Sequence, residues 1–237
     1  MAEKTPEEMR EAVLAIREKM AAAAREAGRD PAEVQLCAAC KTRTAETVAA
    51  SAALPIDVFG ENHVQELCAN FDAGAYCGKP SHFIGHLQTN KIKKVLGRAS
   101  LIQSVGSEHL LTAIEKEAAK ADIVQNVLLE VNIGGEAAKS GFAPEDIAAA
   151  AETALAMPHV RVRGLMTIPP VAMEPHGNLA YFEKMRWLYV DINAKIYDNK
   201  MEYLSMGMSG DFADAIRCGS NMIRVGTAIF GARDYTK

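Results

Sequence analysis

Short apolar runs alternate with longer amphipathic stretches along almost the whole chain. The runs read VQLCAACK, IDVFGEN, SHFIGH, LIQSVGS, VLLEVN, VRGLMTI, MEYLSMG and MIRVGTAIFG, and helical patterns such as SEHLLTAIEKEAAKA and PEDIAAAAETALAM lie between them. The runs are rich in Val, Ile and Leu and show little polar alternation, which is typical of parallel strands covered by helices. Roughly eight such strands alternating with helices predict an α/β fold, a (β/α)8 TIM barrel. An open doubly wound sheet is the alternative.

A further helix precedes the first apolar run. Thr5, Pro6 and Glu8 form a strong helix start, with a hydroxyl cap, a proline at the first helical position and a glutamate at the third. An apolar stripe at helical spacing follows, made of Met9, Val13, Ile16 and Met20. Because composition does not change abruptly anywhere, we expect residues 1–237 to form a single domain with this extra N-terminal helix.

Composition and charge exclude several classes of protein. The 237 residues are 49% hydrophobic and carry a net charge of -4, without a basic stripe, so we expect no nucleic-acid partner. No apolar run approaches the ~18 residues that a membrane span needs. The acidic, helical N-terminus does not resemble a signal peptide, so we expect a cytoplasmic protein whose five cysteines are free thiols.

Cys37 and Cys40 raise the question of a redox or metal pair. Side chains alternate faces along a strand, so these two thiols should point to opposite faces. Their Cα atoms would lie ~10 Å apart at ~3.3 Å per residue, which is too far for a disulfide. We interpret them as small buried hydrophobic residues and expect no metal site.

Lys41 shares a face with Cys37 and Ala39 at the C-terminal end of the same strand. Barrels build their sites at these strand ends. Other strand ends are also polar and carry Gly60, Glu61, Asn62, Gly85, His86, Ser104, Asn132, Thr167, Ser205, Ser209, Gly226 and Thr227. Any single one of these residues could be a helix cap, but together they predict a mouth that binds a polar ligand.

The last two strands indicate an anion site. Barrels often bind phosphate with the loops after these strands, where Gly226 allows close approach of the backbone and Ser209 and Thr227 add hydroxyl donors. Arg224 lies inside the apolar run MIRVGTAIFG and needs an acceptor, which is either a structural carboxylate or a ligand atom. A strand-end lysine, a phosphate site and an inward arginine together suit pyridoxal 5′-phosphate (PLP).

The sequence resembles the pyridoxal-phosphate homeostasis proteins, the YggS/PROSC family, whose fold is similar to the barrel domain of alanine racemase. The matching stretches span residues 38–233 and read AACKTR, FGENHVQEL, HFIGHLQTNKIKKV, LIQSVGS, VNIGGEAAKSGF, VRGLMTIPP and LSMGMSGDFADAIRCGSNMIRVGTAIFGAR. The departures from the family pattern are mild and fall at Cys40, His63, Gly106, Ala137 and Ala138. They leave the cofactor residues intact and put a role for the 136–141 loop in doubt.

This resemblance implies a role for each candidate residue. Lys41 is expected to hold PLP as an internal aldimine, and Arg224 to face the pyridine nitrogen. The expected phosphate cup consists of Ser209, Gly226 and Thr227. Asn62 and His86 are expected to line the site.

Three functions remain open, of which the first is intracellular PLP homeostasis by buffering the cofactor or delivering it to apo PLP-dependent enzymes. The second is an amino-acid racemase of the alanine racemase type, and the third a Schiff-base aldolase, for which Glu61 is the obvious carboxylate beside Lys41. In alanine racemases a second base comes from a further β-domain, which this sequence does not show, and Tyr235 is a poor substitute. We therefore expect a homeostasis protein without robust catalysis, monomeric, with an open cofactor.

Overall fold

Eight parallel strands form a closed barrel in the computed structural model, which describes residues 4–136 and 138–231. The strands are β1 (Gln35–Ala39), β2 (Val58–Glu61), β3 (Ser81–Phe83), β4 (Leu101–Val105), β5 (Gln125–Val131), β6 (Val160–Thr167), β7 (Tyr203–Ser205) and β8 (Met222–Val225). Pairing of β1 with β8 closes the ring. The predicted (β/α)8 barrel is confirmed. Ala137 and Tyr235 lie outside the described residues.

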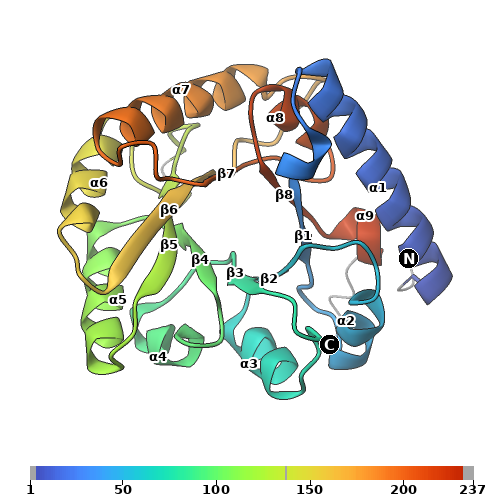
Figure 1. Ribbon diagram of the computed structural model, residues 1–237, viewed down its shortest axis with the longest axis horizontal. Coiled ribbons are helices and arrows are strands. Elements are labelled where there is room, and N and C mark those ends of the chain that lie inside the picture. The colour runs from blue at the N-terminus through green and yellow to red at the C-terminus, as the bar shows by residue number, and fades with distance from the viewer. Residues whose placement is uncertain (1–3, 137, 232–237) are drawn as a thin grey trace.

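Helices surround the barrel on its outer side (Figure 1). They are α1 (Pro6–Glu26), α2 (Ala45–Ser51), α3 (Val64–Asp72), α4 (Ile92–Val95), α5 (Glu108–Lys120), α6 (Ile147–Leu155), α7 (Leu179–Lys195), α8 (Phe212–Arg217) and α9 (Thr227–Phe230), with 3-10 turns at Pro31–Glu33 and Thr89–Lys91. The last apolar run is therefore not one strand. It leaves the sheet after Val225, and α9 begins directly after Gly226.

The predicted start of α1 is confirmed in detail. Thr5 accepts a hydrogen bond from the Glu8 amide, and the Glu8 carboxylate accepts one from the Thr5 amide. The stripe Met9, Val13, Ile16 and Met20 is buried. It packs against the short helices α8 and α9, so α1 completes the outer ring where those two helices cover little of the sheet.

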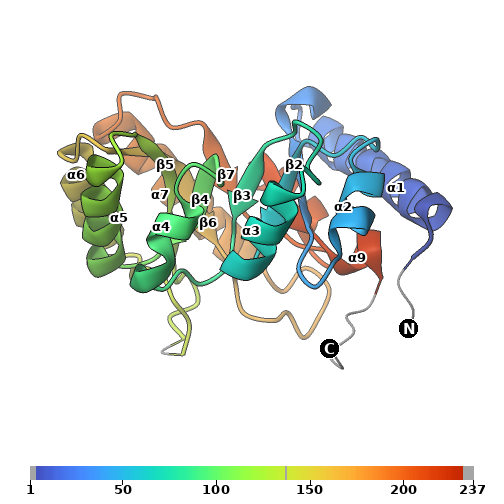
Figure 2. The same ribbon diagram turned by 90° about the horizontal axis from the view of Figure 1, so that it is seen from below.

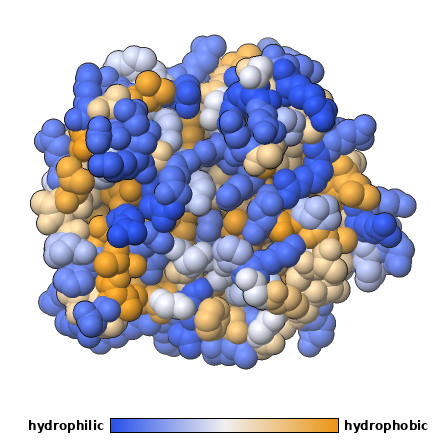
Figure 3. Space-filling model, viewed as in Figure 1, coloured by the Kyte–Doolittle hydropathy of each residue, from blue (hydrophilic) through white to orange (hydrophobic). Residues whose placement is uncertain are grey.

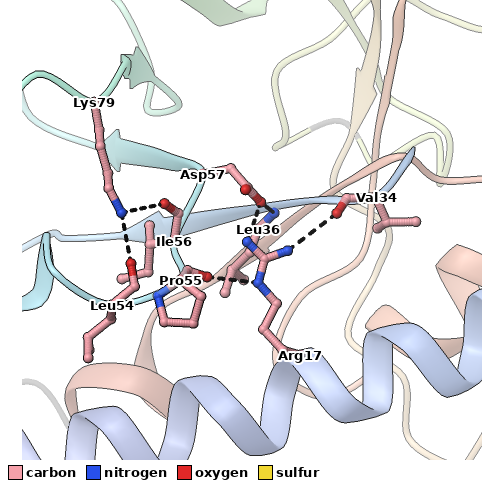
Figure 4. Close-up of polar contacts among 8 residues, drawn as sticks. All are labelled: Arg17, Val34, Leu36, Leu54, Pro55, Ile56, Asp57 and Lys79. Atoms are coloured by element: carbon pink, nitrogen blue, oxygen red, sulfur yellow. Dashed lines mark hydrogen bonds and ion pairs between the residues drawn. The ribbon is translucent and has the colours of Figure 1, made fainter. Parts of the chain in front are cut away.

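A polar network fixes α1 to the start of the sheet (Figure 4). Arg17 donates to the Pro55 carbonyl at 2.7 Å and to Asp57 Oδ2 at 2.6 Å. The same Asp57 oxygen accepts the Leu36 amide of β1 at 2.6 Å. One helix side chain thereby ties the β1 strand to the segment that leads into β2.

Two different environments line the sheet. Outward side chains such as Leu36 and Phe59 join the main hydrophobic core beneath the helices. The inside of the barrel holds two small apolar clusters made of Cys37, Ala39, Val58, Ile84 and Met222, and of Leu101, Leu128 and Met166. Buried polar side chains also point inward, so the barrel is filled by a mixed core.

The loops that follow the strands gather at one end of the barrel. Figure 2 shows the β5–α6 and β6–α7 loops extending to the same side, away from the rest of the molecule. The face seen in Figure 3 is largely hydrophilic, with hydrophobic groups in separate patches. Within residues 4–136 and 138–231, no helix is both long enough and apolar enough to span a bilayer.

Candidate functional site

A pocket of about 280 Å³ opens at the C-terminal ends of the strands. It is lined by Ala39, Lys41, Asn62, Ile84, Ile168, Met208, Ser209, Gly210, Arg224, Gly226 and Thr227. The lining thus includes every residue expected to bind the cofactor except His86. The other polar strand-end residues expected at the mouth, Gly60, Glu61, Gly85, Ser104, Asn132, Thr167 and Ser205, do not belong to it. A larger hollow of about 710 Å³ lies elsewhere, between α6, β6 and the end of α7, and contains none of these residues.

Lys41 lies in a strained turn just beyond β1. The next residue, Thr42, has a φ of 65°, which is rare for a β-branched residue. The turn is anchored on both sides, because the Thr42 amide donates to Glu66 Oε1 at 3.0 Å and the Cys40 amide to the Gly60 carbonyl at 2.9 Å. This anchoring holds the partly buried Lys41 at the pocket wall.

Arg224 reaches the same pocket from β8 with a side chain that is almost fully buried. Its guanidinium donates to Ser205 Oγ at 2.6 Å and to the Thr167 carbonyl at 2.8 Å. These neutral acceptors, rather than the structural carboxylate considered above, satisfy the two terminal nitrogens. Burial lowers the pKa of Arg224 from its ordinary value, but an arginine keeps its proton in proteins.

The loops after β7 and β8 form one wall of the pocket. Asp211 shapes the first loop, because its Oδ1 accepts the Met208 amide at 2.7 Å. This leaves Ser209 and Gly210 at the pocket surface. Across from them, α9 begins after Gly226, whose carbonyl accepts the Ile229 and Phe230 amides, so the Thr227 and Ala228 amides are the ones without an acceptor inside the helix. The wall therefore offers amides and hydroxyls suited to an anion.

Two glycines of this wall differ in what a side chain would meet. A Cβ at Gly226 would lie 3.0 Å from the Ala39 carbonyl oxygen, so the close approach of β8 to the end of β1 leaves little room for a side chain there. A Cβ at Gly210 would meet no atom within 4 Å. Packing against β1 therefore explains a glycine at position 226 in addition to the anion binding that the sequence suggested.

Asn62 and His86, both predicted to line the site, have different positions. Asn62 lines the pocket, and its Oδ1 is buried without a hydrogen-bond partner among the described residues. His86 is exposed and does not belong to the pocket lining. It lies close enough to Glu130, on the inner face of β5, to lower the pKa of that carboxyl.

Glu130 is a buried carboxylate outside the pocket lining that the sequence reasoning missed. The residue is 5% exposed, and its carboxylate accepts a hydrogen bond from Ser140 Oγ at 3.0 Å. Burial raises its pKa, while Ser140, Arg224 and His86 act in the opposite direction. The signal was present, because a glutamate inside the apolar run VLLEVN is as unexpected as the arginine inside MIRVGTAIFG.

Glu61, the carboxylate considered for an aldolase, lies outside the pocket. It is fully buried, and its Oε1 accepts from Asn70 Nδ2 at 2.7 Å and from the Tyr76 hydroxyl at 3.1 Å. Both partners belong to α3 and the segment after it, so Glu61 faces the helix layer. Burial raises its pKa to about 7.

The cysteine pair lies as the strand geometry predicts. Cys37 faces the barrel interior, Cys40 faces the helix layer, and both are free thiols. Burial raises the pKa of both thiols, that of Cys37 to about 12. The residues that the structure describes contain no group of three or more His, Cys, Asp or Glu side chains placed to hold a metal.

The fold and the site define a class of protein. Residues 13–234 match the family described as "Alanine racemase, N-terminal domain". An alanine racemase from Clostridium difficile 630 has the same barrel, with a TM-score of 0.71 at 15% identity over 95% of this chain and 58% of that one. At this identity the likeness shows the fold alone.

Closer relatives narrow the class. The pyridoxal phosphate homeostasis protein of Aquifex aeolicus is 41% identical over 218 residues, which cover 92% of this chain and 95% of the relative. The structure of PipY from Synechococcus elongatus PCC7942, solved with PLP bound, matches with a TM-score of 0.78 at 29% identity, over 91% of this chain and all of that one (100%). The chain belongs to the pyridoxal phosphate homeostasis protein family, as its motifs indicated.

Proposed function

We propose that this protein binds PLP at the mouth of its barrel and serves PLP homeostasis by buffering the cofactor or delivering it. The observation that carries the proposal is the meeting of Lys41, Arg224 and an anion-binding wall in one pocket. The related PipY has been solved with PLP bound, and the Aquifex aeolicus relative is named for PLP homeostasis. Both relatives match almost the whole chain.

The residues present fit this cofactor. Lys41 is the amine that would join the cofactor aldehyde through a C=N bond, with release of one water molecule. The wall formed by Ser209, Gly226 and Thr227 would hold the phosphate, and Arg224 would face the ring nitrogen. Asn62 Oδ1, which is buried and unpartnered among the described residues, would gain a donor from the ligand. When bound, PLP supplies a reactive carbonyl carbon conjugated to an electron-withdrawing ring.

A homeostasis role fits this pocket better than two-base racemisation. Of the side chains that line the described pocket, Lys41 alone carries an amine, carboxylate, imidazole, thiol or phenol. No second base therefore faces it within that lining, whereas racemisation needs a base on each side of the substrate α-carbon. The positive charge of Arg224 also disfavours protonation of the ring nitrogen, which weakens the ring as an electron sink.

The protein is further proposed to work in the cytoplasm. The five cysteines are free thiols, which suits the reducing cytoplasm where we place this protein. We further propose that it acts as a monomer and that apo PLP-dependent enzymes receive the cofactor. A partly exposed Lys41 at the pocket wall is consistent with such release.

An absorbance spectrum before and after borohydride reduction tests the attachment to Lys41. We expect purified protein to be yellow, and reduction to fix the mass of a pyridoxyl group on the peptide that contains Lys41. Lys41→Ala should lose the visible band and remain folded, because a residue at the mouth contributes little to core packing. Lys94→Ala, which changes an exposed lysine on α4, is the matched control. Label on another lysine with none on Lys41 would refute the assignment.

A further inference from the structure

A continuous row of hydrogen bonds crosses the barrel interior behind the pocket. Arg224 on β8 donates to Ser205 Oγ on β7 at 2.6 Å, and this hydroxyl donates to Gln103 Oε1 on β4 at 2.7 Å. Gln103 Nε2 in turn lies 2.9 Å from His82 Nδ1 on β3. All four side chains are at least nine-tenths buried. The row therefore joins the cofactor end of the barrel to groups deep inside it.

The row has one arrangement of donors and acceptors that leaves every group with a suitable partner. A guanidinium only donates, so the Ser205 oxygen must accept from Arg224 and give its own proton to an acceptor. That acceptor is the Gln103 carbonyl oxygen, which leaves the Gln103 amide group as a donor toward His82 Nδ1. His82 is therefore neutral with its proton on Nε2, in agreement with burial lowering its pKa to about 3.

Met222 excludes the flipped orientation of the Gln103 amide. Its Sδ lies 3.1 Å from Gln103 Nε2, and a thioether sulfur is a weak acceptor that pairs with a donor. After a flip, the carbonyl oxygen would face this sulfur, and the Ser205 proton would lose its acceptor. The sulfur and the arginine thus hold Gln103 in one orientation.

The far end of the row reaches the opposite face of the barrel. His82 lines a small cavity of about 210 Å³ with Gln35, Val58, Leu101 and Tyr203. Each of these four residues is the first residue of its strand, so this cavity lies at the N-terminal end of the barrel. The row of hydrogen bonds therefore runs from the cofactor pocket at the C-terminal end of the barrel to this cavity at its N-terminal end.

We propose that Ser205, Gln103 and His82 are positioning residues that hold the Arg224 guanidinium in the plane required to face the cofactor ring. This inference rests on the proposed function, because the ligand of Arg224 is PLP there. A free arginine side chain has many rotamers, and fixed acceptors remove that freedom before the ligand arrives. Gln103 and His82 act only through Ser205 and Arg224, since neither lines the pocket.

The first test uses the protein without cofactor. Nitrogen-15 NMR of the arginine side chains should show Arg224 Nε–H as a sharp signal, identified by its loss in Arg224→Lys. In Gln103→Leu and His82→Leu the signal should broaden or shift, whereas His82→Asn should restore it, because the asparagine oxygen takes the place of the Nδ1 acceptor. Ser81→Ala removes a buried hydroxyl at the position before His82 on the same strand, outside the row, and is the matched control.

The second test measures the pH midpoint of the visible absorbance band in the PLP-loaded protein. A loss of stability alone would not change this midpoint. Arg224 faces the ring nitrogen and disfavours its protonation, so loosening Arg224 should let the ring nitrogen bind a proton more readily. The protonated ring withdraws electrons from the conjugated nitrogen that joins Lys41 to PLP, so the pH midpoint of the visible band should fall by roughly half a unit or more. We expect this fall in Gln103→Leu and His82→Leu, and wild-type midpoints in His82→Asn and Ser81→Ala.

Each outcome of these tests bears on one proposal. An Arg224 signal and a midpoint that are unchanged in Gln103→Leu and His82→Leu would overturn the positioning role. If Gln103→Leu does not fold, the pair His82→Leu and His82→Asn decides the matter alone. A wild-type protein without any reducible visible band would refute the attachment to Lys41, while the NMR measurement would still test the row of hydrogen bonds.

Discussion

At the scale of single residues, two basic side chains share one pocket in contrasting environments. Lys41 is partly exposed on a strained turn, which places its amine at the pocket wall. Arg224 is buried and bonded to Ser205 and to the Thr167 carbonyl, so it stays charged and fixed. These environments suit a lysine that reacts with the cofactor and an arginine that stays fixed beside it.

The anion-binding wall leads to a prediction about ligand selectivity. Gly210→Val should weaken PLP binding strongly but pyridoxal binding much less, because a Cβ at this position meets no protein atom and only the phosphate would lose space. Ser209→Ala should show the same selectivity at roughly 1–2 kcal/mol, the value of one hydrogen bond to a charged group. Titration of the visible band with each ligand measures both effects.

Gly226→Val is the informative contrast to Gly210→Val. Its side chain would press against the Ala39 carbonyl, so it should lower stability as well as affinity, which thermal unfolding would reveal. If Gly210→Val weakened PLP and pyridoxal equally, the wall would not be the phosphate site.

Glu61 leads to a prediction about pH and stability. Burial raises its pKa to about 7 in the folded protein from 4.5, so the folded state binds more protons than the unfolded state between these values. The free energy of unfolding should therefore fall as pH rises from about 4.5 to about 7, by up to about 3 kcal/mol from this residue. Glu61→Gln should flatten this slope, so its stability relative to wild type should be greater at pH 8 than at pH 5.

Urea unfolding at several pH values measures the Glu61 effect. Glu108→Gln, which changes an exposed carboxylate in the first turn of α5, is the control and should leave the slope as in wild type. Parallel pH profiles for wild type and Glu61→Gln would contradict the assignment of the slope to this buried carboxylate.

At the scale of elements, the barrel depends on a helix that the eightfold pattern does not include. Helices α8 and α9 are short, and α1 packs against both of them (Figure 1). Arg17 of α1 then reaches the segment before β2, where Asp57 also holds β1 (Figure 4). The N-terminal helix is thus part of the barrel wall next to the strand that carries Lys41 at its end.

This arrangement predicts that Arg17 contributes to stability beyond its own helix. Arg17→Leu should lower the free energy of unfolding by about 1–3 kcal/mol, because it removes hydrogen bonds to Pro55 and Asp57 and leaves Asp57 without its cation. Arg10→Leu changes an exposed arginine of the same helix and should cost much less. Urea unfolding of the three proteins is the measurement, and equal losses in both variants would show that the network adds nothing.

At the scale of the whole molecule, the barrel gathers the loops after its strands at one end, as Figure 2 shows for the β5–α6 and β6–α7 loops. Lys41, at the end of β1, and the anion-binding wall, after β7 and β8, meet there because β1 pairs with β8. Closure of the barrel therefore creates the pocket from the two halves of the sequence.

The molecule as a whole should act as a carrier of PLP rather than as an enzyme. Mixed with an apo PLP-dependent enzyme, the loaded protein should restore that enzyme's activity, and Lys41→Ala should not. Incubated with each common L-amino acid in deuterated water, it should show no sustained racemisation and little deuterium at the α-carbon, because no second base lines the described pocket. Sustained turnover above ~1 s⁻¹ on one amino acid would instead establish the racemase.

The amino-acid sequence by itself determined the local features and the class of fold. Alternation along β1 placed Cys37 and Cys40 on opposite faces and Lys41 at the mouth, because the side-chain period of a strand is two. The capping residues fixed the start of α1, and the apolar runs fixed the number of strands. These properties depend on neighbours in the chain, which is why the sequence sufficed for them.

Tertiary structure alone decided which distant side chains meet. His86 and Glu61 lie at strand ends like Asn62, but only Asn62 faces the pocket, because the direction of a residue near a strand end depends on where the strand leaves the sheet. The partners of Arg224 come from β6 and β7, and the row behind it continues to Gln103 on β4. Such contacts exist only once the barrel has closed and brought the inward faces of separate strands within hydrogen-bond distance.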